Sequence, residues 1–208
     1  MKVDIYNSKG QPTGRQVELS DDIFAVSPNE HVVYLAVKQY LAGKRSGTHA
    51  TKEKSTLSGS TRKLHKQKGT GGSRKGSIKN PLFRGGARIF GPQPRDYSFK
   101  LNKKVKSLAK RSALSTKLAA DAIRIVEDFT FDAPRTKAYL EVLQNFGLNG
   151  KKSLYVADEV TDSVYLSCRN IQGADISAVE GLNVYDILNA STVLISEKSI
   201  ELLHQQLA

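Results

Sequence analysis

The fold class is decided by residues 122–157, which read AIRIVEDFTFDAPRTKAYLEVLQNFGLNGKKSLYVA. Apolar residues dominate Ala122–Val126 and Ser153–Ala157, and runs of this length are typical of buried strands. Between them, Thr136–Phe146 repeats apolar residues at helical spacing and ends at Gly147, a common helix stop. A strand, a helix and a strand in this order predict a βαβ unit with parallel strands.

The same alternation continues toward the C-terminus. Further strands are predicted over Ala174–Val179 and Ser191–Ser196, and further helices over Ser163–Cys168, Val184–Asn189 and Glu197–Leu207. Asp162 and Asn183 are expected to cap the two short helices. The pattern predicts an α/β fold with a mostly parallel sheet and helices on both faces, a three-layer, Rossmann-like arrangement.

The N-terminal part adds a hairpin and a helix. Val3–Tyr6 and Arg15–Leu19 alternate in polarity on either side of a turn-rich segment, which predicts an antiparallel hairpin. The run Ser27-Pro28-Asn29-Glu30 has the form of a capping box with proline at the first helical position, so a helix is expected from there to Gly43. A basic, amphipathic helix is expected within residues 101–122.

The segment between these two helices has a different composition. Residues 44–111 hold 20 Lys and Arg against the two acids Glu53 and Asp96, a formal charge of +18, whereas the rest of the chain holds 12 bases and 18 acids, or −6. A segment with high charge and little apolar surface cannot offset its own ordering entropy. We therefore expect a globular α/β domain formed by residues 1–43 and 101–208, interrupted by an extended basic, glycine-rich loop over residues 44–100.

Composition narrows the function classes. The net charge of +12 and the pI near 9.7 predict an anionic partner. Cys168 is the one cysteine, so no intrachain disulfide can form, as is usual in the cytoplasm. No secretory signal and no run of 18 apolar residues is present, so a cytoplasmic protein with no membrane partner is expected.

The glycine-rich stretch Gly69–Ser73 does not match a nucleotide-binding motif. Arg74 stands where a dinucleotide fingerprint needs its third glycine, and the lysine of a P-loop is missing after Gly76. The four histidines and Cys168 have no metal-ligand spacing, and Cys168 is expected to be a small buried residue. Neither a cofactor nor a metal is expected.

Three readings follow from the residues. The first is a non-catalytic RNA-binding protein, because Arg62, Arg74, Arg84, Arg88 and Arg95 can fork onto phosphates or stack on unpaired bases. The second is a small-molecule α/β enzyme with a basic insert, which a pocket at the carboxyl ends of the strands would favour; Asp158-Glu159 follows a strand end, but a solvated turn is the simpler explanation. The third is a free RNA chaperone or regulator.

Several stretches carry a family resemblance. They are GKRSGTHATK (residues 43–52), KQKGTGGSRKGS (66–77), NPLFRGGARIFGPQPR (80–95) and KLNKKVKSLAKRSALS (100–115). With the order of the flanking elements, they resemble the universal family of large-subunit ribosomal protein four in its bacterial form. The resemblance extends over essentially the whole chain and is most specific between Gly43 and Ser115.

The resemblance implies a structural constituent of the large ribosomal subunit that is not an enzyme. Family members bind 23S-type rRNA early in subunit assembly, and their loop lines the exit tunnel beside the nascent peptide and large-subunit protein twenty-two. Some bacterial members also repress their own operon or affect transcription termination. The residues expected to bind rRNA are Lys44, Arg45, Arg62, Lys63, Lys66, Lys68, Gly69, Thr70, Gly71, Arg74, Lys75, Lys79, Arg84, Arg88, Arg95, Lys103 and Lys104. The expected tunnel tip is Arg62, Lys63, Leu64, His65 and Lys66.

Two departures from the family pattern concern the loop. Many bacterial members have Trp-Arg where this chain has His65-Lys66, and Arg-Ala-Arg where it has Gly72-Ser73-Arg74. The imidazole of His65 is smaller than an indole, which weakens stacking at the tip. Glycine at position 72 removes a guanidinium and with it a phosphate contact.

Overall fold

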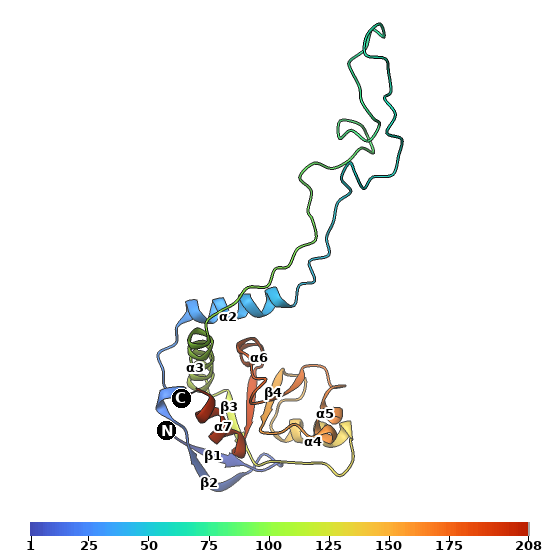
Figure 1. Ribbon diagram of the computed structural model, residues 1–208. Coiled ribbons are helices and arrows are strands. Elements are labelled where there is room, and N and C mark those ends of the chain that lie inside the picture. The colour runs from blue at the N-terminus through green and yellow to red at the C-terminus, as the bar shows by residue number, and fades with distance from the viewer. Residues whose placement is uncertain (208) are drawn as a thin grey trace. The chain divides into compact units, whose positions relative to one another are not determined.

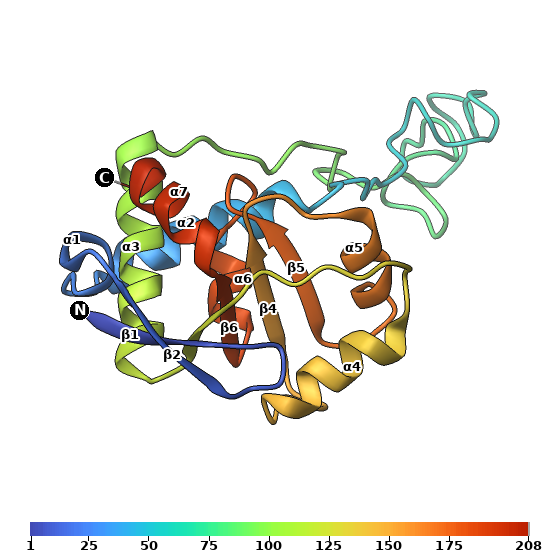
Figure 2. The same cartoon turned by 90° about the horizontal axis from the view of Figure 1, so that it is seen from below.

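The computed structural model describes residues 1–207, and its chain forms two units (Figures 1 and 2). One unit comprises Met1–Leu41 with the chain from Lys100 onward, and the other comprises Ala42–Phe99. The elements in chain order are β1 (Lys2–Tyr6), β2 (Pro12–Glu18), α1 (Asp21–Phe24), α2 (Glu30–Gly43), α3 (Lys103–Ala119), β3 (Ile123–Val126), α4 (Thr136–Asn145), β4 (Ser153–Ala157), α5 (Asp162–Cys168), β5 (Ala174–Ala178), α6 (Val184–Asn189), β6 (Thr192–Ser196) and α7 (Glu197–Leu207).

The first unit is built on one sheet with the strand order β2-β1-β3-β6-β4-β5. The hairpin pair β1–β2 is antiparallel, and every other neighbouring pair is parallel. The last strand of the chain, β6, lies between β3 and β4, where Ile195 pairs with Ile125 and Leu194 pairs with Tyr155. The predicted α/β fold with a mostly parallel sheet is therefore confirmed.

Helices cover both faces of this sheet. The connections through α4 and α5 lead outward across the sheet to β4 and β5, and the connection through α6 leads back to β6. Because such crossovers are right-handed, a reversal of direction moves the helix to the opposite face. Accordingly α4 and α5 lie on one face, and α6 lies on the other with α2, α3 and α7 (Figures 1 and 2).

The two faces hold two apolar cores, as β6 illustrates. Val193 and Ile195 belong to the larger core under α2, α3, α6 and α7, whereas Leu194 belongs to the smaller core under α4 and α5. Side chains of a strand point alternately to its two faces, so a strand buried on both sides is apolar throughout. The three central residues of β6, Val193, Leu194 and Ile195, have this property.

Two predicted helix boundaries are confirmed in detail. Gly147 has φ +66° and donates its N–H to the Gln144 carbonyl at 2.9 Å, while Leu148 donates to the Leu143 carbonyl at 2.8 Å. These two bonds form a Schellman motif, which needs a residue in the left-handed region. At the start of α6, the Asn183 side chain accepts the Asp186 N–H at 2.8 Å.

Two predicted caps are wrong. The helix α2 begins at Glu30, and its cap is Asn29, whose Oδ1 accepts the Val32 N–H at 3.1 Å, rather than Ser27. The Asn29 N–H donates to the Ser112 hydroxyl of α3 at 3.2 Å, which positions Asn29 at the helix start. Asp162 is the first helical residue of α5, after the cap position at Thr161. The short helix α1 was not expected.

Candidate nucleic-acid interface

The unit Ala42–Phe99 is a hairpin of two irregular limbs (Figure 1). Backbone hydrogen bonds join the limbs at Arg95 N–H to Gly47 O (3.2 Å), Thr51 N–H to Pro92 O (3.0 Å), Arg88 N–H to Lys52 O (3.0 Å) and Leu64 N–H to Gly76 O (3.1 Å). No helix or strand lies between residues 45 and 99. Most backbone groups there have no internal partner, so they face water or a ligand.

A cluster of side chains around Tyr97 joins the two limbs near their ends. Two guanidinium groups lie over the Tyr97 ring, with Arg45 Cζ at 3.9 Å and Arg95 Cζ at 4.5 Å from its centroid. The Tyr97 hydroxyl is 2.6 Å from His49 Nε2. Gly47 has φ +59°, and a Cβ there would lie 2.0 Å from the Arg95 carbonyl oxygen, so only glycine fits. The two cations share one ring, and a phosphate beside them would relieve their mutual repulsion.

Asp96, the acidic residue nearest in sequence to the Tyr97 cluster, forms hydrogen bonds with Ser98 instead. Its carboxylate accepts the Ser98 N–H at 2.8 Å and the Ser98 hydroxyl at 2.5 Å. These hydrogen bonds lower the pKa of the Asp96 carboxyl from its usual value, and the bond from the Ser98 hydroxyl has the largest effect. The carboxylate therefore stabilises its own turn, and among the described residues it forms no ion pair with Arg45 or Arg95.

The apex of the hairpin lies beyond the bridge between Leu64 and Gly76. Every residue from Ser58 to Arg74 is exposed, so the whole predicted tunnel tip is accessible. Arg62 and Lys63 precede the bridge, whereas His65 and Lys66 follow it. Within the described chain, no carboxylate forms an ion pair with any of the loop arginines at positions 62, 74, 84 and 88.

Most of the residues expected to bind rRNA are exposed. Half-buried exceptions are Lys75, whose Nζ lies 5.7 Å from the Phe83 ring centroid, and Lys79. The exposed members are Lys44, Arg45, Arg62, Lys63, Lys66, Lys68, Gly69, Thr70, Gly71, Arg74, Arg84, Arg88, Arg95, Lys103 and Lys104. Exposed cations of this kind are typical of a surface that binds an anionic partner.

The basic helix α3 uses its cations in two ways. Lys103 and Lys104 in its first turn are exposed. Farther along, Arg111 donates to the Leu207 carbonyl, and Lys117 donates to the Ala190 carbonyl at 2.6 Å. Burial lowers the pKa of Lys117. Only the first part of the helix therefore offers free charge, a division that helical periodicity did not predict.

A cavity of about 200 Å³ lies at the carboxyl ends of β3 and β4. Its lining includes the stacked rings of Phe129 and Tyr155, 4.7 Å apart, and the exposed Asp158 and Glu159. Asp158 and Glu159 lie in the expected solvated turn, and no sequence pattern predicts their proximity to residues 128–129. Small-molecule sites usually measure about 300–1,000 Å³, so this cavity is small for a substrate, whereas a second hollow at the carboxyl ends of β4 and β5, lined by Asp158, Glu159 and Glu180, measures about 780 Å³.

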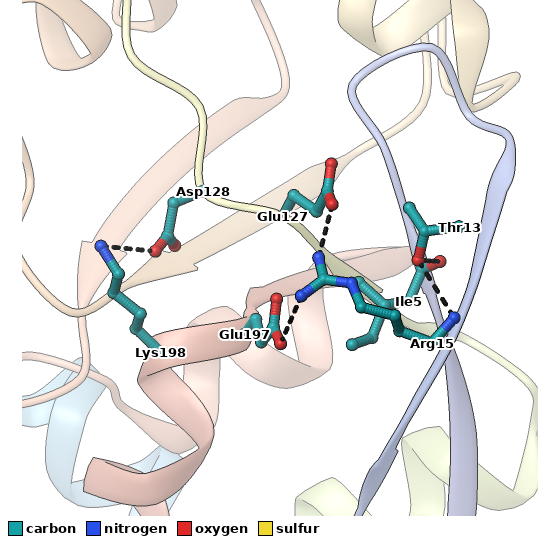
Figure 3. A network of polar contacts seen from close by, with 7 residues as sticks. All are labelled: Ile5, Thr13, Arg15, Glu127, Asp128, Glu197 and Lys198. Carbon is teal, nitrogen blue, oxygen red and sulfur yellow. Dashed lines mark hydrogen bonds and ion pairs between the residues drawn. The ribbon is translucent and has the colours of Figure 1, made fainter.

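Two charged residues that line this cavity, Asp128 and Lys198, belong to a set of ion pairs that connect elements of the sheet unit, as Figure 3 shows. Lys198 pairs with Asp128 at 3.2 Å, and Arg15 pairs with Glu127 at 2.5 Å and with Glu197 at 3.2 Å. These ion pairs join β2, the end of β3 and the start of α7. Each of these charges already has a partner.

Other candidate catalytic groups are unsuited to chemistry. Cys168 is buried, and burial raises the pKa of its thiol to about 11, so the reactive thiolate is scarce at neutral pH. Within residues 1–207, no cluster of three or more His, Cys, Asp and Glu could hold a metal ion. No helix in the same range is long and apolar enough to cross a membrane.

Comparison with known proteins gives a consistent result. The family model described as "Ribosomal protein L4/L1 family" matches residues 17–206. The chain is 52% identical over 201 residues, 97% of each chain, to "Large ribosomal subunit protein uL4" of Bacteroides fragilis. It is 52% identical over 208 residues, 100% of each chain, to the protein of the same name from Flavobacterium psychrophilum, and 51% identical over 205 residues to that from Porphyromonas gingivalis, covering 99% of this chain and 98% of the relative.

Proposed function

Because the chain belongs to the ribosomal protein L4/L1 family, we propose that it is a structural, rRNA-binding constituent of the large ribosomal subunit in the cytoplasm. The observation that carries the proposal is the +18 charge of residues 44–111, much of it on exposed side chains without internal ion pairs. In this proposal the cavity beside Phe129 has no catalytic role.

The mechanism of binding is neutralisation of folded RNA. Each loop cation that contacts a phosphate releases a condensed counterion, and the gain in entropy drives binding. Cations held in internal ion pairs would have to break those pairs first, whereas Arg62, Arg74, Arg84 and Arg88 have none to break. Gly47 and the side-chain cluster at Tyr97 hold the two limbs together, so binding of RNA has to order fewer residues and costs less conformational entropy.

The test is removal of the loop. The Arg95 N–H donates to the Gly47 carbonyl at 3.2 Å, so the ends of the loop are adjacent and deletion of residues 48–93 can be closed by a short connection. We expect a folded protein that binds large-subunit rRNA weakly and with little salt dependence. If the shortened chain held rRNA through the same salt range as the full chain, the loop would not be the main contact.

A finer part of the proposal concerns the tip. We propose that Arg62, Lys63, Leu64, His65 and Lys66 line the nascent-peptide exit tunnel, near large-subunit protein twenty-two. His65→Cys gives an accessible thiol, whereas Cys168 is buried and stays unreactive. A thiol-directed crosslinker should join position 65 to a stalled nascent peptide. If the Arg84→Cys variant formed crosslinks to the nascent peptide and the His65→Cys variant formed none, this location of the tip would be contradicted.

Incorporation into the subunit separates a scaffold from a free RNA chaperone. A primary assembly protein should bind large-subunit rRNA before most other proteins are added, and should sediment with the subunit through moderate salt. Release at low salt would favour the free regulator. Autoregulation of the operon is a secondary part of the proposal.

A further inference from the structure

One aromatic residue of the loop has an unusual position. Phe90 is fully exposed at 102% of its reference surface, and its φ is +53°. Among the described residues, Asp121 is the other non-glycine residue with positive φ. Bulky side chains seldom adopt this region, so the surrounding chain must impose it.

The imposing feature is a bulge in the return limb. Arg88 N–H donates to Lys52 O at 3.0 Å, and Thr51 N–H donates to Pro92 O at 3.0 Å. Adjacent residues of the outgoing limb thus bond to residues four apart on the return limb, and residues 89–91 are extruded between them. This arrangement resembles an extended β-bulge, which turns a side chain in a new direction.

Gly91 allows the bulge to close. A Cβ at this position would lie 1.9 Å from the Thr51 side-chain oxygen, so the return limb can approach Thr51 only with glycine here. The side chain of the neighbouring Phe90 is then left fully exposed to solvent. No ring or cation of the described chain lies against it, in contrast to Phe83 and Tyr97, which have cations over their rings.

The charges around Phe90 select its partner. Lys52, Arg84, Arg88 and Arg95 are exposed in the same unit, whereas Glu53 accepts a hydrogen bond from Gln93 Nε2 at 2.5 Å. A cationic surface attracts RNA, and the apolar surface that irregular RNA presents is the face of an unpaired base. An apolar pocket on another protein would have to tolerate the same cations.

We propose that Phe90 is a stacking platform for an unpaired nucleobase of the bound RNA, an inference that rests on the proposed rRNA-binding function. The loop then grips RNA by two independent means, charge along both limbs and one base stacked on the bulge. Stacking on an aromatic side chain strengthens binding by roughly 5- to 150-fold for each base.

The chain has no tryptophan, so Phe90→Trp creates a single fluorescent reporter at this position. We expect deproteinised large-subunit rRNA to quench its emission, because a stacked base quenches an indole, and long-chain polyphosphate to bind without quenching. Leu82→Trp is the matched control, since Leu82 is 89% exposed in the same loop but lies outside the bulge. Equal quenching at both positions, or no quenching by rRNA, overturns the proposal.

Affinity provides the second measurement. Phe90→Leu keeps apolar volume but removes the ring, and it should weaken rRNA binding by roughly 5- to 150-fold relative to Phe90→Tyr, with the salt dependence unchanged. Phe90→Gly relaxes the backbone and should bind as weakly as Phe90→Leu. If the unaltered chain binds rRNA in a salt-sensitive way and Phe90→Leu binds with the same affinity, the stacking proposal is refuted while the rRNA-binding function stands. Absence of salt-sensitive binding by the unaltered chain refutes the rRNA-binding function itself.

Discussion

Four loop arginines without internal ion pairs set the salt dependence of RNA binding. The change is the combined replacement of Arg62, Arg74, Arg84 and Arg88 by glutamine, which removes charge and keeps much of the side-chain length. All four side chains are exposed in the protein, so the fold of the globular unit should not change.

The magnitude follows from the number of phosphates contacted. Each phosphate contact contributes about 0.7 to 0.9 to the slope of log K against log salt, so four contacts contribute roughly 3. Between about 0.1 and 0.3 M potassium chloride, the unaltered chain should lose roughly 25-fold more affinity for large-subunit rRNA than the variant. Filter binding at several salt concentrations measures this difference.

The control removes the same charge from the globular unit. Lys2, Arg15, Arg124 and Lys198 all pair with carboxylates. Their replacement by glutamine gives the same net charge as the loop variant, 12 − 4 = +8. Exposed pairs contribute about 0–1 kcal/mol each, so this variant should fold, with a somewhat lower melting temperature. If both variants lost equal slope, binding would follow net charge alone, and the reasoning from unpaired loop arginines would be refuted.

Three further predictions concern stability and loop order. Gly47→Ala should displace the two limbs at their hydrogen bond, because its Cβ would lie 2.0 Å from a carbonyl oxygen at φ +59°; faster amide exchange in residues 45–51 and weaker rRNA binding should follow, and unchanged exchange would contradict this. Ile195→Ala should lower the free energy of unfolding by about 2–5 kcal/mol, measured by urea denaturation, since this side chain is 1% exposed in the central strand; an effect below about 1 kcal/mol would argue against the described core. Burial raises the pKa of Cys168 to about 11 and also raises those of Tyr139 and Tyr155, so their neutral forms stabilise the fold below the unfolded-state pKa values. The contribution of Cys168 is lost as the pH rises from about 9 through 11, whereas that of the two tyrosines begins to fall only above about pH 10. Cys168→Ala should reduce this alkaline loss of stability, and an identical pH profile in that variant would assign the loss to other groups.

Local rules were sufficient for much of the fold. The alternation of apolar strands and amphipathic helices in residues 122–207 predicted the parallel sheet, because both periodicities are properties of the chain itself. Gly147 and Asn183 act within one helical turn, so their roles were readable without a structure. The charge of the loop was equally evident, since the acid-free stretch between Glu53 and Asp96 needs no contacts to be recognised.

Contacts between distant residues decided the rest. The position of β6 between β3 and β4 depends on packing and crossover handedness, which leave no mark on the strand itself. The helix α2 starts after Asn29 rather than at the expected capping box, because the Asn29 N–H bonds to Ser112 of α3. Arg111 and Lys117 are not free cations of the basic face, because each donates to a backbone carbonyl distant in sequence. The full exposure of Phe90 depends on hydrogen bonds between residues some 40 positions apart. Such cross-chain bonds exist only once the limbs meet, and therefore composition and periodicity could not have predicted them.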